Sequence, residues 1–222
     1  MVPPFIELTN LTKNFGNGKG IFDLSFGVQQ GEVFGFLGPN GAGKSTTIRH
    51  LMGFMKPQSG SCQIMGKDCF SQAALIQQSV GYLAGEIAFI EDMSGISYLN
   101  FIADMKGIRD RSSIRDLLYR FELNPRGKIK KMSKGMKQKI GLVAAFMGDP
   151  SVLILDEPTS GLDPLMQNRF VELLLERKKK GSTVFMSSHI FEEVEKTCNR
   201  TAIIREGRLV DIVQMKELSK LR

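Results

Sequence analysis

The feature of this sequence that most constrains its fold is a glycine-rich segment between an apolar run and a helical pattern. Residues 33–37 read VFGFL, residues 38–46 read GPNGAGKST, and the residues that follow open a helix. A strand, a loop and a helix in this order form a P-loop, in which backbone N–H groups and the positive end of the helix surround phosphate oxygens. We expect Gly38, Gly41 and Gly43 to adopt backbone angles that are closed to other residues.

The side chains at the end of this loop have separate predicted roles. Lys44 is expected to reach the β- and γ-phosphates of a nucleotide, and the Ser45 hydroxyl to take one position around Mg²⁺. Thr46 and Thr47 can donate to the inner phosphates. The alternative is an ordinary glycine-rich turn, which does not require a strand, a lysine, a serine and a helix in register. The predicted ATP-binding residues of the loop are Gly38, Pro39, Asn40, Gly41, Ala42, Gly43, Lys44, Ser45, Thr46 and Thr47.

A second strand pattern ends in two carboxylates. Residues 152–155 read VLIL, a run typical of a buried parallel strand, and Asp156 and Glu157 follow it. Ligands in open α/β sheets bind at the carboxyl ends of strands, so both acids are expected to face the P-loop. Asp156 is predicted to hold Mg²⁺, directly or through water, because a hard cation prefers oxygen ligands. Glu157 is predicted to orient the attacking water or accept its proton; a helix cap or a solvated strand end is the alternative for this residue.

The chain between these two motifs is too long for a simple βαβ crossover. Residues 98–108, 113–123 and 136–147 each place apolar side chains at three- and four-residue steps, which indicates helices. We therefore predict a single α/β domain over residues 1–222, with a helical subdomain inserted at about residues 86–148. Its central sheet is expected to be mostly parallel, with an antiparallel β portion at the N-terminus, from residue 5 to about residue 28.

A second anion site is predicted at the start of the last of these helices. Residues 132–138 read MSKGMKQ, in which Ser133 is a good N-cap and is followed by a glycine and flanking lysines. The distance in sequence from the P-loop suggests that this site serves a different nucleotide.

These residues carry a resemblance to the ATP-binding subunits of ATP-binding cassette (ABC) transporters, which extends over nearly the whole chain. Residues 132–136 stand where that family has its LSGGQ-type signature, and residues 160–163 (SGLD) resemble its D-loop. His189 resembles the switch histidine of the family. Phe15, in KNFG, stands where the family usually stacks an aromatic ring on adenine; plain core packing is the alternative.

The resemblance implies a fold, a reaction and partners. Two subunits are expected to sandwich two ATP molecules, with Ser133 and Gly135 of each chain facing the nucleotide on the P-loop of the other. Asp163 lies in the D-loop and, with Pro164 after it, also has the pattern of a helix N-cap. The implied catalytic residues are Lys44, Glu157 and His189, the metal residues are Ser45 and Asp156, and the cofactors are ATP and Mg²⁺.

Three departures from the family pattern limit this comparison. Lys134 replaces the first signature glycine, so its side chain either points away or adds positive charge near the γ-phosphate. Met136 replaces the signature glutamine. Gly85 stands at the position of the Q-loop glutamine, and Glu86 or a water is left to substitute for it.

Composition and the resemblance together indicate the partners. No apolar run approaches the length of a membrane span, so we expect separate transmembrane subunits, with this chain on the cytoplasmic face of the membrane in a homodimer or heterodimer. The segment of residues 86–93 is apolar enough to dock a short helix of such a partner. Likeness to drug and small-molecule exporter subunits favours export. The net charge of +7 leaves nucleic-acid or ribosome binding as an alternative that we do not expect, and a small-molecule P-loop kinase as another.

Overall fold

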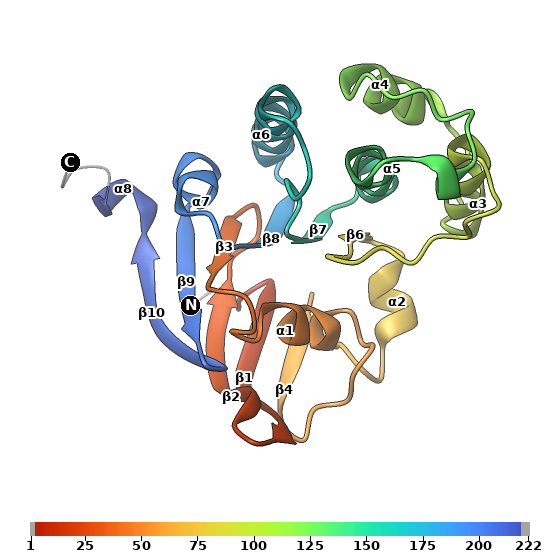
Figure 1. The fold of residues 1–222 in the computed structure, drawn as a ribbon. Helices are drawn as coiled ribbons and strands as arrows, with labels where there is room; N and C mark the ends of the chain where they lie inside the picture. Colours follow the sequence, from red (N-terminus) through yellow and green to blue (C-terminus); the bar gives the residue numbers. More distant parts are fainter. Residues whose placement is uncertain (1–2, 219–222) are drawn as a thin grey trace.

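The structure is a computed structural model that describes residues 3–218. Two β-sheets pack on each other, and helices cover the free face of the larger one (Figure 1). The elements in chain order are β1 (Ile6–Gly16), β2 (Lys19–Val28), β3 (Val33–Leu37), α1 (Lys44–Leu51), β4 (Ser59–Ile64), β5 (Lys67–Asp68), α2 (Ala73–Gln77), β6 (Val80–Leu83), α3 (Gly95–Met105), α4 (Ser112–Arg120), the 3₁₀ turn η1 (Ile129–Lys131), α5 (Lys134–Phe146), β7 (Val152–Asp156), α6 (Pro164–Lys179), β8 (Thr183–Ser188), α7 (Phe191–Thr197), β9 (Arg200–Arg205), β10 (Arg208–Gln214) and α8 (Met215–Leu218).

The larger sheet has six strands in the order β10-β9-β3-β8-β7-β6. The five strands from β9 to β6 are parallel, and only the edge strand β10 runs antiparallel, to β9. β7 and β8 are buried at every residue, as expected for parallel strands that are covered on both faces. The predicted mostly parallel central sheet is therefore confirmed.

The smaller sheet is antiparallel, in the order β2-β1-β4-β5. The predicted N-terminal β portion was too short, because β4 pairs with β1 and β5 pairs with β4, although both follow the P-loop helix in sequence. Alternate residues of β4, Cys62 and Ile64, are buried against the larger sheet, and this burial favours the pairing.

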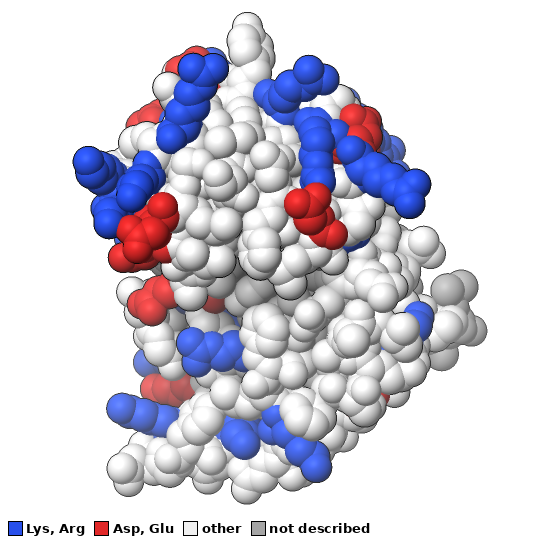
Figure 2. All heavy atoms as spheres, turned by 90° about the vertical axis from the view of Figure 1, so that its right-hand side faces the viewer, with Lys and Arg blue, Asp and Glu red and all other residues white. Residues whose placement is uncertain are grey.

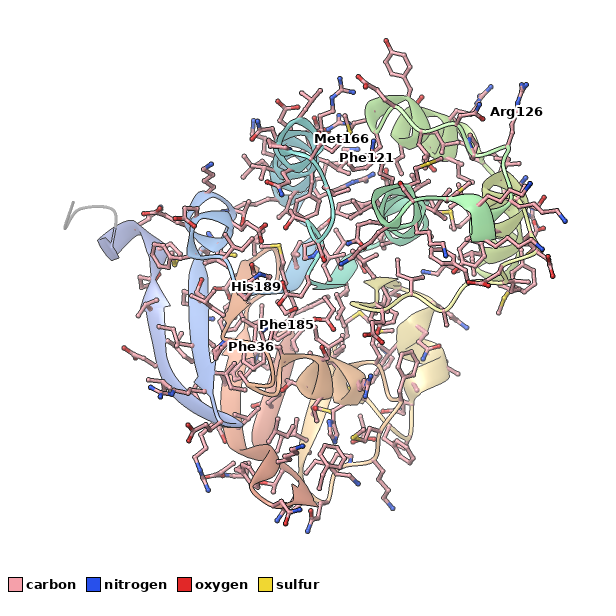
Figure 3. The ribbon with its side chains drawn as sticks, viewed as in Figure 1. Phe36, Phe121, Arg126, Met166, Phe185 and His189 are labelled. Atoms are coloured by element: carbon pink, nitrogen blue, oxygen red, sulfur yellow. The ribbon has the colours of Figure 1, made fainter. Side chains whose placement is uncertain are left out.

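Two hydrophobic cores lie on the two faces of the larger sheet. One contains Phe36 and Phe185 and is closed by α1 and the smaller sheet; the other contains Phe121 and Met166 and is closed by α5, α6 and α7. Figure 3 shows Phe36 and Phe185 below the larger sheet and Phe121 and Met166 above it. Arg126 points outward at the far end of the helical layer. Consecutive residues of the central strands alternate between the two cores.

Helices form where the periodicity predicts them, at α3, α4 and α5. The Ser133 hydroxyl accepts a hydrogen bond from the N–H of Met136 at 3.2 Å, so the predicted N-cap of α5 is confirmed. The core of α3 and α4 continues through α5 to the sheet. We retain residues 86–148 as a proposed subdomain on sequence grounds.

No helix in the described range 3–218 is both long and apolar enough to cross a membrane.

Candidate functional site

The P-loop connects β3 to α1 and depends on two left-handed glycines. Gly41 has a φ of 79° and Gly43, the N-cap of α1, has a φ of 107°, both in the region that favours glycine. Gly38 does not have a positive φ, contrary to our expectation. It is needed for close packing instead, because a Cβ there would collide with the Ile204 carbonyl oxygen of β9.

Lys44 lies folded back over the loop that it follows. Its Nζ donates to the carbonyls of Gly38 at 2.6 Å and Pro39 at 3.1 Å. The same Nζ lies 3.2 Å from Oε1 of Glu157. The ammonium group is thus held at the mouth of the loop, where a bound phosphate would meet it.

The hydroxyl residues after Lys44 differ in their surroundings. Ser45 is exposed and Thr46 is half-buried. Thr47 is buried, and both its N–H and its hydroxyl donate to the Gly43 carbonyl at 3.0 Å. Its donors are therefore already used within α1, and the predicted phosphate contact of Thr47 does not agree with this geometry.

Asp156 and Glu157 lie at the carboxyl end of β7, next to the P-loop. The Ser187 hydroxyl of β8 donates to Oδ1 of Asp156 at 2.5 Å and accepts the Glu157 N–H at 3.1 Å. Sequence reasoning missed this role of Ser187, because its partner Asp156 is 31 residues away on a neighbouring strand.

Glu157 joins the P-loop to the end of β8. Its Oε2 lies 2.7 Å from Nδ1 of His189, while Oε1 faces Lys44. Its φ of 50° is in the left-handed region, which is costly for a residue with a side chain and is typical of functional sites. A solvated strand end does not describe this carboxylate.

Ser45 and Asp156, the predicted metal residues, line the same cleft, which has a volume of about 560 Å³. Asp156 Oδ2 faces the cleft and lies 3.0 Å from where a Cβ of Gly85 would be. Burial, and then the charge of Asp156, raise the pKa of Tyr82 in the same cleft. The oxygen donors available, a carboxylate and a hydroxyl, fit Mg²⁺.

The N-terminus of α5 lies close to the D-loop segment. A Cβ on Gly135 would lie 2.8 Å from the Gly161 carbonyl oxygen, and a Cβ on Gly161 would lie 3.3 Å from Cγ of Lys134. The stem of Lys134 therefore runs along Gly161. Ser133 is exposed and does not line the cleft that holds Ser45.

Asp163 and Phe15 occupy contrasting positions. Asp163 Oδ1 accepts the Met166 N–H at 3.0 Å, so it caps α6 as predicted, with Pro164 at the first turn. Phe15, near the end of β1, is 54% exposed, which rules out the core alternative.

Polar side chains of α7 and α5 hold the loops after β7 and β8, and sequence reasoning missed these contacts. Glu193 accepts hydrogen bonds from the hydroxyls of Thr159 and, at 2.7 Å, Ser188. The side-chain amide of Gln138 in α5 reaches the carbonyls of Glu157 and Pro158.

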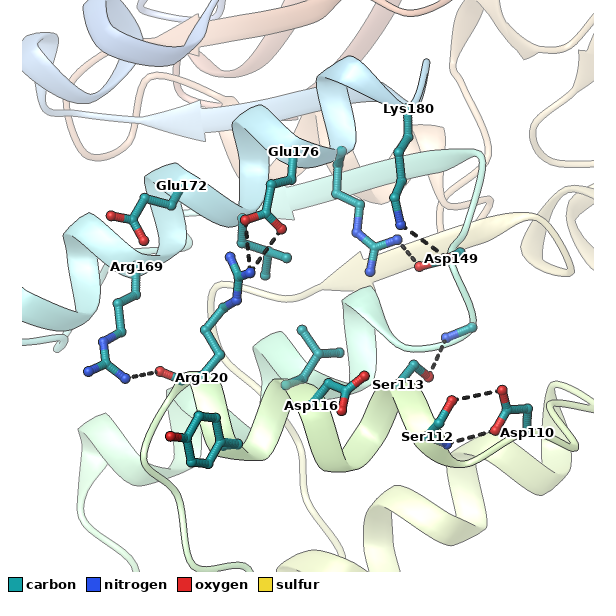
Figure 4. Close-up of a pocket in the computed structure, with 15 residues that line it drawn as sticks. Asp110, Ser112, Ser113, Asp116, Arg120, Asp149, Arg169, Glu172, Glu176 and Lys180 are labelled. Carbon is teal, nitrogen blue, oxygen red and sulfur yellow. Dashed lines mark hydrogen bonds and ion pairs between the residues drawn. The ribbon is translucent and has the colours of Figure 1, made fainter.

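A larger hollow, of about 980 Å³, lies between α4 and α6 (Figure 4). Ion pairs line it, including Arg120 with Glu176 at 2.8 Å and Arg177 with Asp149. No residue that we predict to bind ATP or metal lines this hollow.

The fold and the cluster around Lys44 define the class of the protein, a P-loop nucleotide-binding protein. Comparison with known proteins is more specific. A family model described as ABC transporter matches residues 21–160. The chain belongs to this family, as an ATP-binding subunit of the ABC ATPase type.

The relatives agree with this assignment. The chain is 40% identical over 216 residues to the uncharacterized ABC transporter ATP-binding protein YhcH of Bacillus subtilis, covering 96% of this chain and 70% of the relative. It is 37% identical over 220 residues to the bacitracin transport ATP-binding protein BcrA of Bacillus licheniformis, covering 97% and 71%.

Solved structures give the same result. An ATP-binding subunit of an ABC transporter superimposes with a TM-score of 0.86 at 29% identity, covering 98% of this chain and 92% of that one. The dimeric ABC transporter cassette MJ0796 gives a TM-score of 0.85 at 20% identity, covering 95% and 98%, which supports the fold alone.

Proposed function

We propose that the chain hydrolyses ATP to ADP and phosphate, in a dimer of ATP-binding subunits, and thereby powers export through separate transmembrane subunits. The observation that carries the proposal is the convergence of Lys44, Glu157 and His189 at the mouth of the P-loop. Lys44 begins α1, whereas Glu157 and His189 directly follow β7 and β8. Each side chain has the charge or hydrogen-bonding capacity that phosphoryl transfer to water requires.

The proposed reaction assigns one task to each group. Lys44 binds the β- and γ-phosphates, Glu157 orients the attacking water or accepts its proton, and His189 contacts the γ-phosphate and holds Glu157 through their hydrogen bond. Ser45 and Asp156 would hold Mg²⁺, and Ser187 orients Asp156. When bound, Mg²⁺ neutralises phosphate charge.

The remaining nucleotide contacts divide between the two subunits. The P-loop backbone of residues 38–43, the exposed ring of Phe15 and the half-buried Thr46 serve the chain's own ATP. Ser133 and Gly135 bind the ATP of the partner subunit. Asp163 fixes the loop that reaches across to that subunit. The exposure of Ser133 at the capped end of α5 supports a contact with a second molecule.

The dependence of ATPase activity on protein concentration tests the proposed dimer. Activity per mole of chain is expected to rise with protein concentration, and the Glu157→Gln chain with ATP is expected to sediment as a dimer, because hydrolysis is blocked while the sandwich forms. A constant specific activity over a wide concentration range, with no ATP-induced dimer, would contradict the arrangement. Mixing with a second cassette from the same cell distinguishes a homodimer from a heterodimer.

The membrane partner is proposed to dock in the cleft between the helical layer and the sheet. Figure 2 shows this face, with a hollow of uncharged atoms across its middle and Lys and Arg gathered above and below it. Ile87 and Ala88 of the segment 86–93 line the cleft, and Ile90 of the same segment is 48% exposed. Phe89, in contrast, packs edge-on against Tyr98 at 5.1 Å between ring centroids. We propose that docking here holds the chain at the membrane, on its cytoplasmic face.

Export is proposed because BcrA is named for bacitracin transport and another relative is named a probable multidrug ABC transporter ATP-binding protein of Escherichia coli. The second match is 33% identical over 210 residues and covers 36% of that relative. Co-purification of the chain with a polypeptide of several membrane spans tests this. Salt-sensitive RNA or DNA binding would favour the nucleic-acid alternative instead, and phosphoryl transfer to a small acceptor would favour a kinase.

A further inference from the structure

The first half of α5 touches the chain that follows β7 at successive points. Near its start, Gly135 and the stem of Lys134 lie against Gly161. One turn further, the side-chain amide of Gln138 donates to the carbonyl of Pro158 at 2.8 Å and lies 3.3 Å from the carbonyl of Glu157. Helix α5 is thus attached to the backbone of Glu157, the proposed catalytic carboxylate.

The contact of Gln138 is buried and specific. Its side chain is only 6% exposed, and its Nε2 supplies N–H donors to two consecutive carbonyls. Buried carbonyls without a donor are costly, so an apolar side chain at this position removes the described donor of the Pro158 carbonyl. The Glu157 carbonyl keeps the Ser160 N–H at 3.1 Å but loses its link to α5. The backbone that receives these bonds is the one held in the left-handed region at Glu157.

The other supports of Glu157 come from different directions. Ser187 of β8 accepts its N–H, the Ser160 N–H donates to its carbonyl at 3.1 Å, and His189 and Lys44 contact its carboxylate. Among the described contacts of Glu157, only the one from Gln138 leads to α5, whose capped N-terminus is the proposed site for the partner's ATP.

We propose that Gln138 is a positioning residue that transmits the occupancy of the α5 N-terminus to Glu157 of the same chain. The inference rests on the proposed function, in which Ser133 binds the partner's nucleotide. Ser133 and Gln138 are five positions apart, so about 7.5 Å of rigid helix separates the anion site from the amide. A phosphate that fixes the start of α5 thereby fixes the carbonyls on which the orientation of Glu157 depends, and each ATP site controls hydrolysis in the other.

The experiment is a series of unbranched side chains at position 138. Gln138→Met keeps the length and removes the donors, and Gln138→Lys keeps a donor at the end of the chain. We expect Gln138→Met to lower kcat on the order of 10- to 100-fold, the effect of misplacing a reacting group, with KM for ATP changed less than about 3-fold. Gln138→Lys is expected to recover part of kcat.

The matched control is Gln77→Met, which lies away from the site. It also removes an amide donor to a backbone carbonyl, that of Met52 at 3.0 Å.

A double-mutant cycle tests the transmission itself. If Ser133 and Gln138 act through one route, Ser133→Ala and Gln138→Met together lower kcat little more than the stronger single change. Additive losses overturn the inference, as does an unchanged kcat in Gln138→Met. Equal losses of kcat in Gln138→Met and Gln138→Lys, with KM rising and thermal stability falling, show a merely structural glutamine and also overturn it. If Gln138→Met does not fold, Gln138→Glu, which keeps the shape and offers acceptors in place of the donors, replaces it in both comparisons.

A separate measurement tests the proposed function. ATP-induced dimerisation of Glu157→Gln and of Glu157→Gln with Gln138→Met is measured by sedimentation, and both are expected to dimerise. If neither chain dimerises although each binds ATP, the sandwich fails and the inference falls with it. If both dimerise and kcat is insensitive to position 138, the sandwich stands and only the role of Gln138 is overturned.

Discussion

The Nζ of Lys44 lies 3.2 Å from Oε1 of Glu157, with the two side chains 6% and 20% exposed. The proposed phosphate-binding cation and the proposed catalytic carboxylate are therefore direct partners. A bound triphosphate competes with Glu157 for Lys44, so this ion pair opposes nucleotide binding. Once phosphate engages Lys44, we expect Oε1 of Glu157 to be free for the attacking water, while Oε2 keeps its hydrogen bond with His189.

This competition separates binding from hydrolysis. Lys44→Ala is expected to abolish tight ATP binding, because the β- and γ-phosphates lose their cation. Glu157→Gln is expected to slow hydrolysis on the order of 10²- to 10⁴-fold, the usual contribution of a general base. The same variant is expected to bind ATP about 3- to 10-fold more tightly, a gain of roughly 1 kcal/mol, because Lys44 no longer has an anionic competitor. Fluorescent ATP-analogue titration and phosphate release measure the two effects, and equal loss of binding in both variants would contradict these roles.

Phe15 predicts weak discrimination between nucleotide bases. An exposed ring can stack on adenine or guanine but reads no hydrogen-bonding edge of either. GTP is therefore expected to be hydrolysed at a rate comparable to ATP, and Phe15→Ala to raise KM for both nucleotides together. Strong preference for ATP that survives Phe15→Ala would place the base-reading contact elsewhere.

The docking proposal is tested best at Ile90. Phe89 packs on Tyr98, so a charge there disturbs the fold, whereas Ile90→Asp places its charge on an exposed side chain and is expected to leave folding and basal ATPase activity intact. Loss of co-purification with the membrane subunit and of transport is the expected result. Val210→Asp, at an exposed apolar position of the edge strand β10, is the matched control. Normal assembly and transport by Ile90→Asp would place the docking site elsewhere.

His50 predicts a pH dependence of stability. Its Nδ1 donates to the Thr46 carbonyl at 2.8 Å, its Nε2 has no partner among the described residues, and burial lowers its pKa in the folded chain below the ordinary value of 6.5. Below about pH 6.5 the unfolded chain takes up a proton that the folded chain does not, so the free energy of unfolding falls as pH falls. The slope is at most about 1.4 kcal/mol per pH unit for one proton.

Urea unfolding at pH 7.5, 6.5 and 5.5 measures this effect in the wild type and in His50→Asn, whose amide can keep the bond to Thr46. The wild type is expected to lose more stability than the variant between pH 6.5 and 5.5, while the difference between them stays constant above that window. Parallel curves through all three values would show that His50 is not the titrating group.

Local chemistry is what the sequence determined by itself. The P-loop, the caps at Ser133 and Asp163, and the buried strand before Asp156 depend on residues a few positions apart, so their geometry follows from backbone preference and short-range hydrogen bonding. Parallel strands also meet at their carboxyl ends whatever lies between them, which is why Asp156 and Glu157 could be placed beside Lys44.

Tertiary packing decided which side chains from separate helices and strands contact one another. The reach of the smaller sheet to β4 and β5, the collision that keeps Gly38 a glycine, and the hydroxyl of Ser187 on Asp156 each involve partners on separate elements. Gln138 and Glu157 are 19 residues apart and meet only because α5 packs beside the end of β7. Such contacts form when the chain buries two apolar faces of one sheet at once, and local sequence does not specify which side chains that burial brings together.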